Sequence, residues 1–72
     1  MAYRIKSTAL LGTGVSEEYE NLNKKQALDK GNILLANAQI KGWEVSDQFS
    51  TVPQLVEIYR DNAAYTVAIL EQ

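Results

Sequence analysis

Neither cysteine nor histidine occurs in this chain of 72 residues, and that absence limits how it can fold. A domain this small buries a modest share of its surface, so its core supplies little stability. Small domains commonly compensate with disulfides, a bound metal or self-association. Disulfides and the zinc sites built from Cys and His are excluded here. The fold must therefore depend on close packing, on self-association, or on both.

The composition favours an ordered domain. Apolar residues make up 46% of the chain and charged residues 22%, both ordinary values for globular proteins. One proline and four glycines are too few for a flexible linker or a disordered tail. The sequence contains no internal repeat. We expect a single α+β domain over residues 1–72.

The first segment, residues 3–11, alternates in a way typical of a β-strand. Tyr3 and Ile5 fall on one face of this strand, whereas Arg4 and Lys6 fall on the other. The pattern breaks near its end, where two leucines are adjacent. We therefore expect a first strand with one buried face.

The clearest helix signal lies in the middle of the chain. Asn23 is a suitable N-cap, and Gln26 stands at the spacing of a capping box. An apolar stripe at helical spacing follows, formed by Ala27, Leu28, Gly31, Leu34, Leu35 and Ala38. Gly42 suits the left-handed position after a helix, so we expect a helix over residues 23–41. The acidic residues near Ser16 leave an earlier start open.

Three further segments have strand character. Residues 43–49 alternate, and residues 64–71 alternate with both faces fairly apolar. Residues 55–60 are β-prone, although Pro53 could also open a short helix there; we favour the strand. A strand apolar on both faces is either central in its sheet or meets another subunit. The predicted order is β-α-β-β-β, with one helix packed on a mostly antiparallel sheet.

Charge and hydropathy exclude several classes of protein. The net charge is −2 and the cations are spread along the chain, which disfavours nucleic-acid binding. No apolar run approaches the roughly 20 residues that a membrane-spanning helix requires. The first residues lack the long apolar stretch of a signal peptide. We therefore expect a cytoplasmic protein without a membrane or nucleic-acid partner.

The sequence offers little for catalysis. The usual general base, His, and the strongest nucleophile, Cys, are both missing. Glu44 and Asp47 fall on opposite faces of one predicted strand, so they cannot act as a pair. Three acidic residues cluster near the predicted helix start, namely Glu17, Glu18 and Glu20. Acidic side chains exposed to solvent are favoured there by the helix dipole, which explains the cluster without a catalytic or metal-binding role. We expect no enzymatic activity, no metal site and no cofactor.

Two features could bind a small ligand. The loop between the first strand and the helix occupies the place of a phosphate loop, but lacks the third glycine and the Lys-Ser/Thr pair of the known motifs. Trp43 follows the glycine at the helix end and could cap the core or stack on a flat ligand at a subunit interface. The candidate ligand-binding residues are Trp43, Gly12, Thr13, Gly14 and Ser16.

Self-association has its own candidates. Ile33 and Ile40 project on the side of the predicted helix away from the apolar stripe. Ile69 and Leu70 represent the two apolar faces of the last strand. A monomer of this size would expose part of this apolar surface, whereas an oligomer would bury it. We therefore expect a closed homo-oligomer with either the last strand or the Ile33/Ile40 face at its interface, and we favour the strand.

The run Ile40-Lys41-Gly42-Trp43-Glu44-Val45, which follows Leu34-Leu35, resembles a signature of small uncharacterised bacterial and phage domains. In these domains a Tyr-rich first strand precedes a helix that ends in Gly-Trp-Glu-Leu. The resemblance covers residues 3–5, 34–45 and 65–70, under half of the chain, and Val45 stands in place of the leucine. It implies a fold of β-α-β-β type and no known chemistry.

A second similarity is to the dodecins, flavin-storage oligomers of β-α-β-β topology. They also begin with a Tyr-x-Ile strand, here Tyr3 to Ile5, and place a tryptophan at the start of the strand after the helix. Trp43 matches their flavin-stacking tryptophan by position. The rest of their flavin pocket has no counterpart that can be traced in this sequence.

Two functions fit these observations. The first is a non-enzymatic, homo-oligomeric interaction or regulatory protein, of a size found among phage and accessory genes. The second is a small-ligand-binding oligomer, a sponge or carrier for a nucleotide or a flavin-like molecule. In the first case the partner is the chain itself or another protein, and in the second a small molecule.

Overall fold

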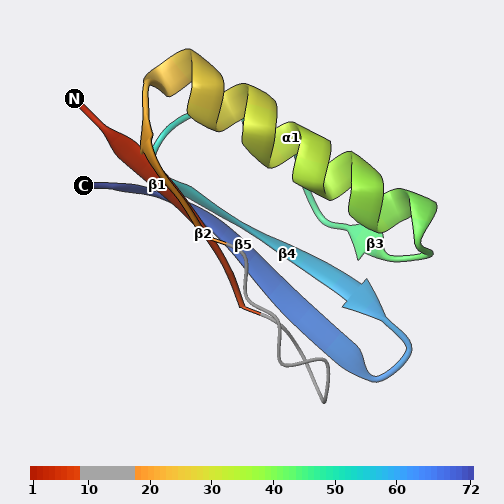
Figure 1. The fold of residues 1–72 in the computed structure, drawn as a ribbon. Coiled ribbons are helices and arrows are strands. Elements are labelled where there is room, and N and C mark those ends of the chain that lie inside the picture. Colours follow the sequence, from red (N-terminus) through yellow and green to blue (C-terminus); the bar gives the residue numbers. More distant parts are fainter. Residues whose placement is uncertain (9–17) are drawn as a thin grey trace.

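A computed structural model describes residues 1–8 and 18–72 and shows one helix packed against a five-stranded sheet (Figure 1). The elements are β1 (Tyr3–Thr8), β2 (Glu18–Leu22), α1 (Lys24–Ile40), β3 (Glu44–Val45), β4 (Gln54–Arg60) and β5 (Ala63–Glu71). The strand order is β2-β1-β5-β4-β3, and every neighbouring pair is antiparallel. The expected α+β class, with one helix on a mostly antiparallel sheet, is confirmed.

Both predicted ends of the helix are confirmed. The Asn23 side chain accepts a hydrogen bond from the Gln26 backbone N–H at 2.8 Å, and the Gln26 side chain accepts one from the Asn23 N–H at 2.9 Å. This is the capping box that the spacing predicts. Gly42 follows the C-cap with φ +92°, a left-handed conformation that strains residues with a side chain.

Strand β2 was not predicted, and an earlier helix start near Ser16 is wrong for residues 18–22. The pairing of β1 with β2 shifts register between Tyr3 and Ile5, and Asn21 has a positive φ of 59°. This bulge interrupts the alternation by which a strand is recognised in a sequence. The described order is therefore strand-strand-helix followed by three strands.

The later strands differ in extent from their predictions. The expected strand over residues 43–49 is reduced to Glu44–Val45, and a loop over residues 46–53 follows it. Strand rather than helix is confirmed for residues 55–60, which lie within β4. Strand β5 lies between β1 and β4, so its predicted central place in the sheet is confirmed.

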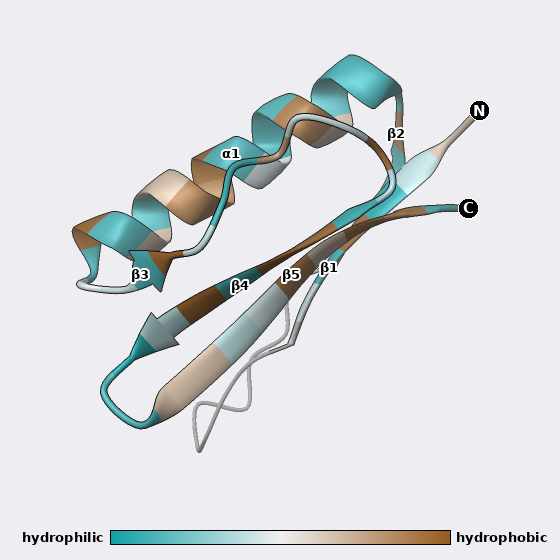
Figure 2. Cartoon of the chain, turned by 180° about the vertical axis from the view of Figure 1, so that it is seen from behind, coloured by the Kyte–Doolittle hydropathy of each residue, from teal (hydrophilic) through white to brown (hydrophobic). Residues whose placement is uncertain are grey.

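The core lies between α1 and one face of the sheet. The helix contributes the buried Ala27, Gly31 and Leu35, which all belong to the predicted apolar stripe. The other buried residues are Tyr3, Ile5, Phe49, Val56, Ile58, Val67 and Ile69. Figure 2 shows the apolar and polar segments that alternate along the helix and along β4. Alternation along each strand thus leaves one sheet face for the helix and one face without it.

Phe49, in the loop over residues 46–53, fixes how closely the loop approaches the helix. Its ring lies so near Gly31 that a Cβ on Gly31 would come within 2.6 Å of a ring carbon. The Asn32 side chain donates to the Phe49 carbonyl at 3.0 Å and accepts from the Phe49 N–H at 2.9 Å. The loop, which runs beside the helix in Figure 2, therefore closes one long edge of the helix–sheet interface.

The contact between Gly31 and Phe49 predicts the sign of a stability change. Gly31→Ala should lower the free energy of unfolding by about 1–3 kcal/mol, because the added methyl overpacks against the ring. At an open helical position the same substitution raises stability by about 0.5–1 kcal/mol. Urea unfolding of the wild type, of Gly31→Ala and of Gly31→Ala with Phe49→Leu measures the effect. The smaller leucine should recover part of the loss, and a more stable Gly31→Ala protein would contradict the packing.

Candidate functional site

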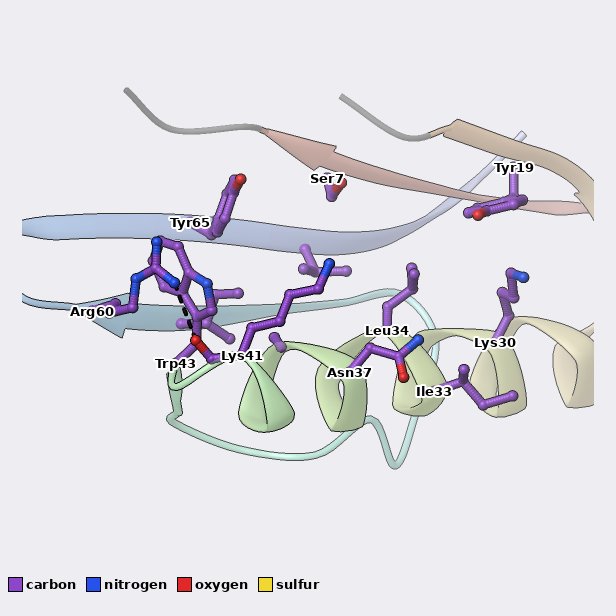
Figure 3. Close-up of a pocket in the computed structure, with 13 residues that line it drawn as sticks. Ser7, Tyr19, Lys30, Ile33, Leu34, Asn37, Lys41, Trp43, Arg60 and Tyr65 are labelled. Carbon is purple, nitrogen blue, oxygen red and sulfur yellow. Dashed lines mark hydrogen bonds between the residues drawn. The ribbon is translucent and has the colours of Figure 1, made fainter. Parts of the chain in front are cut away.

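The long edge of the helix–sheet interface opposite Phe49 is open and holds a cavity of about 460 Å³ (Figure 3). Its lining comes from all the long elements: Ser7, Tyr19, Lys30, Ile33, Leu34, Asn37, Ala38, Lys41, Trp43, Ile58, Arg60, Tyr65 and Val67. The helical members share one flank of α1, because they repeat at intervals of three and four residues. No residue of the loop over residues 46–53 contributes to this lining.

The charged residues of the cavity all have the same sign. Lys30, Lys41 and Arg60 line it, and among residues 1–8 and 18–72 no Asp or Glu belongs to the lining. Among the described residues the one ion pair, Lys25–Asp29 at 3.6 Å, lies at other positions of the helix. The cavity is thus locally cationic although the whole chain carries a net charge of −2. A concave site with like charges attracts counter-ions of the opposite sign.

The aromatic side chains hold two of these cations in place. The Arg60 guanidinium lies 4.5 Å from the centroid of the Trp43 ring and donates from Nη1 to the Lys41 carbonyl at 3.1 Å. Lys30 Nζ lies 4.4 Å from the centroid of the Tyr19 ring. Such cation–π contacts orient a charge without neutralising it. In Figure 3 the side chains of Lys30 and Lys41 extend from the helix toward the sheet.

Trp43 is half-buried and lines the cavity, as a ligand-binding residue would. Its ring centroid lies 4.7 Å from that of Tyr65 with the ring planes inclined by 46°. The indole therefore already contacts the Tyr65 ring and the Arg60 guanidinium. A flat ligand that stacked on Trp43 would compete with these contacts, so the indole is better suited to orienting Arg60.

The other predicted ligand-binding residues, Gly12, Thr13, Gly14 and Ser16, lie outside the described residues. Sequence reasoning missed the cations of the cavity. Lys30 and Lys41 stand eleven residues apart, a spacing that returns to the same helix face and could have indicated a pair. No such signal exists for Arg60, because its position depends on the strand register.

A second surface is the sheet face turned away from α1, which we call the open sheet face. It carries Arg4 and Lys6 of β1, Leu55, Glu57 and Tyr59 of β4, and Ala64, Thr66, Ala68 and Leu70 of β5. In Figure 1 the helix lies on the other side of the sheet. None of these nine side chains is buried, and Leu55 keeps 58% of its surface exposed.

On the three central strands of the open sheet face charge is divided between the two sides, while Glu18 of the edge strand β2 stands opposite Lys6 in the register. Arg4 and Lys6 lie on β1, and Glu57 lies on β4, with the mostly apolar β5 between these strands. Tyr59 is 40% exposed beside Glu57. A hydrogen bond to the Glu57 carboxylate, together with desolvation and its negative charge, raises the pKa of Tyr59.

The four predicted interface residues separate in the structure. Ile33 and Ile40 are exposed on the helix, by 53% and 83%. Leu70 lies half-buried on the open sheet face. Ile69 is fully buried beneath the helix, which corrects its placement at an interface: its strand face is occupied by the chain's own core.

Comparison with known proteins gives no relative: no family model, no curated protein and no solved structure matches this chain. In the part of the chain that the structure describes, no helix is long and apolar enough to cross a membrane. The same residues contain no group of three or more acidic side chains placed to hold a metal ion. The cavity and the open sheet face are therefore the features from which we infer a function.

The cationic cavity predicts how ions quench the fluorescence of Trp43, the only tryptophan in the sequence. The quenching of Trp43 by iodide, divided by its quenching by caesium, should be larger than the same ratio for free N-acetyltryptophanamide. The reason is that the local positive charge attracts anions. The net charge of the chain alone would predict the opposite. Stern–Volmer constants for both ions measure this preference. It should diminish in a variant with Lys41→Gln and Arg60→Gln, and an unchanged ratio would refute a cationic environment.

Proposed function

We propose that this protein is a non-enzymatic, homo-oligomeric interaction or regulatory protein of the cytoplasm, and that its open sheet face binds a second copy of the chain. The observation that supports this most is the sheet itself, which has a helix on one face alone. Leu55, Ala68 and Leu70 provide an apolar centre for the contact. Burial of such a surface contributes about 25 cal/mol per Å² of apolar area.

The charge pattern on β1 and β4 of the open sheet face complements the same pattern on a second copy of the chain. In a dimer with a two-fold axis parallel to the strands and above β5, β1 of one copy lies across β4 of the other. Arg4 and Lys6 of each protomer then face the side that carries Glu57 in its partner. A pattern that is self-complementary under a two-fold rotation is what an isologous interface requires.

The other surfaces fit a second copy less well. The edge strand β2 is short and bulged, and β3 has two residues, features that disfavour addition of a strand at either edge. Ile33 and Ile40 lie seven residues apart on a helix whose exposed positions are otherwise mostly polar. Exposed apolar side chains that occur singly are common on monomers. These comparisons favour the open sheet face.

Binding of a small ligand is the second candidate function, and the cavity between α1 and the sheet is the observation that favours it. Its volume of about 460 Å³ lies within the usual range for ligand sites. The cavity and the open sheet face lie on opposite sides of the sheet. The two functions are therefore compatible in one homo-oligomer.

Sedimentation equilibrium at micromolar concentration tests self-association with a charge exchange. Lys6→Glu and Glu57→Lys should each weaken the dimer by about tenfold or more, because each places like charges opposite each other. The variant with both substitutions should recover most of the wild-type affinity. Lys6 and Glu57 are both exposed, so the fold should persist in these variants, as circular dichroism would verify.

A variant with Ile33→Lys and Ile40→Lys is the matched control for the helix face and should remain dimeric. A monomeric wild-type protein would overturn the proposal of self-association. A dimer that only the helix variant dissociates would move the interface to α1. The two-fold arrangement would be refuted if Lys6→Glu and Glu57→Lys each weakened the dimer and the variant with both substitutions did not recover the affinity.

A further inference from the structure

The cationic cavity has a composition that the rest of the fold does not require. Lys30, Lys41 and Arg60 line one concavity, and none of the other described residues contributes a carboxylate to its lining. The chain has nine acidic and seven basic residues. Lys and Arg side chains with a purely structural role could therefore form ion pairs with Asp or Glu. We infer that this cavity binds a small organic oxyanion, a phosphate monoester or a dicarboxylate, with Arg60 and Lys41 as its principal ligands.

Capping of the helix explains only part of this arrangement. Arg60 donates one hydrogen bond to the Lys41 carbonyl, where cations are favoured by the partial negative charge of a helix C-terminus. That partial charge is about half a unit, so the two cations outweigh it. Lys30 lies about 16 Å from Lys41 along the helix axis. At that distance the partial charge of the helix C-terminus does not stabilise it. Capping therefore does not account for Lys30.

Arg60 is well prepared to bind an oxyanion. A guanidinium has five N–H donors in a planar fork that matches phosphate and carboxylate oxygens. One of its groups, Nη1, donates to the Lys41 carbonyl, and the Trp43 ring lies against the guanidinium. These contacts restrict the side chain before a ligand arrives, which lowers the entropy that binding costs.

The remaining walls suit an organic group rather than a bare ion. Leu34, Ala38, Ile58 and Val67 supply apolar surface to the cavity. Asn37 and Ser7 add polar groups to the lining. The volume of about 460 Å³ exceeds what an inorganic phosphate would fill, and it accommodates a molecule with a ring or a short chain. A dianion would match the pair of charges from Arg60 and Lys41.

Isothermal titration calorimetry with defined probes tests the inference on the full chain. Phenyl phosphate represents a phosphate monoester with an apolar body, and phthalate represents a dicarboxylate. Inorganic phosphate isolates the contribution of charge, whereas benzyl alcohol isolates that of the ring. One or both organic dianions should bind with a submillimolar Kd, inorganic phosphate more weakly, and benzyl alcohol not at all. Emission from Trp43 locates the binding, because no other tryptophan is present.

Single substitutions assign the residues. Arg60→Gln and Lys41→Gln should each weaken binding by about tenfold, the loss of one charge-assisted hydrogen bond. Lys30→Gln should weaken it by a smaller factor, while retaining the capping contact of Arg60. The exposed Lys24 is the matched control, since Lys24→Gln makes the same change of charge away from the cavity and should leave Kd within about twofold.

Two results would overturn the inference. One is the absence of saturable binding by both organic dianions up to about 10 mM, a range in which even a weak specific site is occupied. The other is an equal loss of affinity in Lys24→Gln and Lys41→Gln, which would show attraction to the overall charge alone. The open sheet face takes no part in this site, so the inference stands or fails separately from self-association.

Discussion

Phe49 lies against the backbone of Gly31, and this contact determines how the helix sits on the sheet. Because Gly31 has no side chain, the aromatic ring can pack directly against the helix backbone. The Asn32 amide then fixes the Phe49 backbone through two hydrogen bonds, as a neighbouring strand would. A chain without disulfides thereby gains an anchor for the loop over residues 46–53. One edge of the helix–sheet interface is closed by that loop, and the other edge remains open.

The open edge and the open sheet face both result from how few elements the chain has. One helix covers one face of five strands, and the described residues place no layer on the opposite face. The aromatic and cationic side chains at the open edge contact one another rather than filling the space, as the position of Arg60 over Trp43 shows. The proposed functions use these two surfaces, the cavity and the open sheet face.

The parts of the fold that depend on local sequence could be predicted, whereas those that depend on distant contacts could not. The capping residue Asn23, the terminal glycine Gly42 and the central strand β5 follow from spacing alone. The bulged strand β2 is defined by its pairing with β1, and its acidic residues resemble a helix start. At the candidate site, Trp43 was predicted, but Arg60 reaches it through the register of β4, which no short-range pattern encodes.

The central claim is that Phe49 closes one edge of the helix–sheet interface by packing on Gly31. Nuclear Overhauser spectroscopy of the wild-type protein tests it most directly. The account predicts strong cross-peaks between the Phe49 ring and the Gly31 Hα protons. It also predicts that ring currents displace the Gly31 Hα resonances from their usual helical values, because these protons lie close to the aromatic ring. A Phe49 ring without cross-peaks to α1, and Gly31 resonances at ordinary positions, would contradict it.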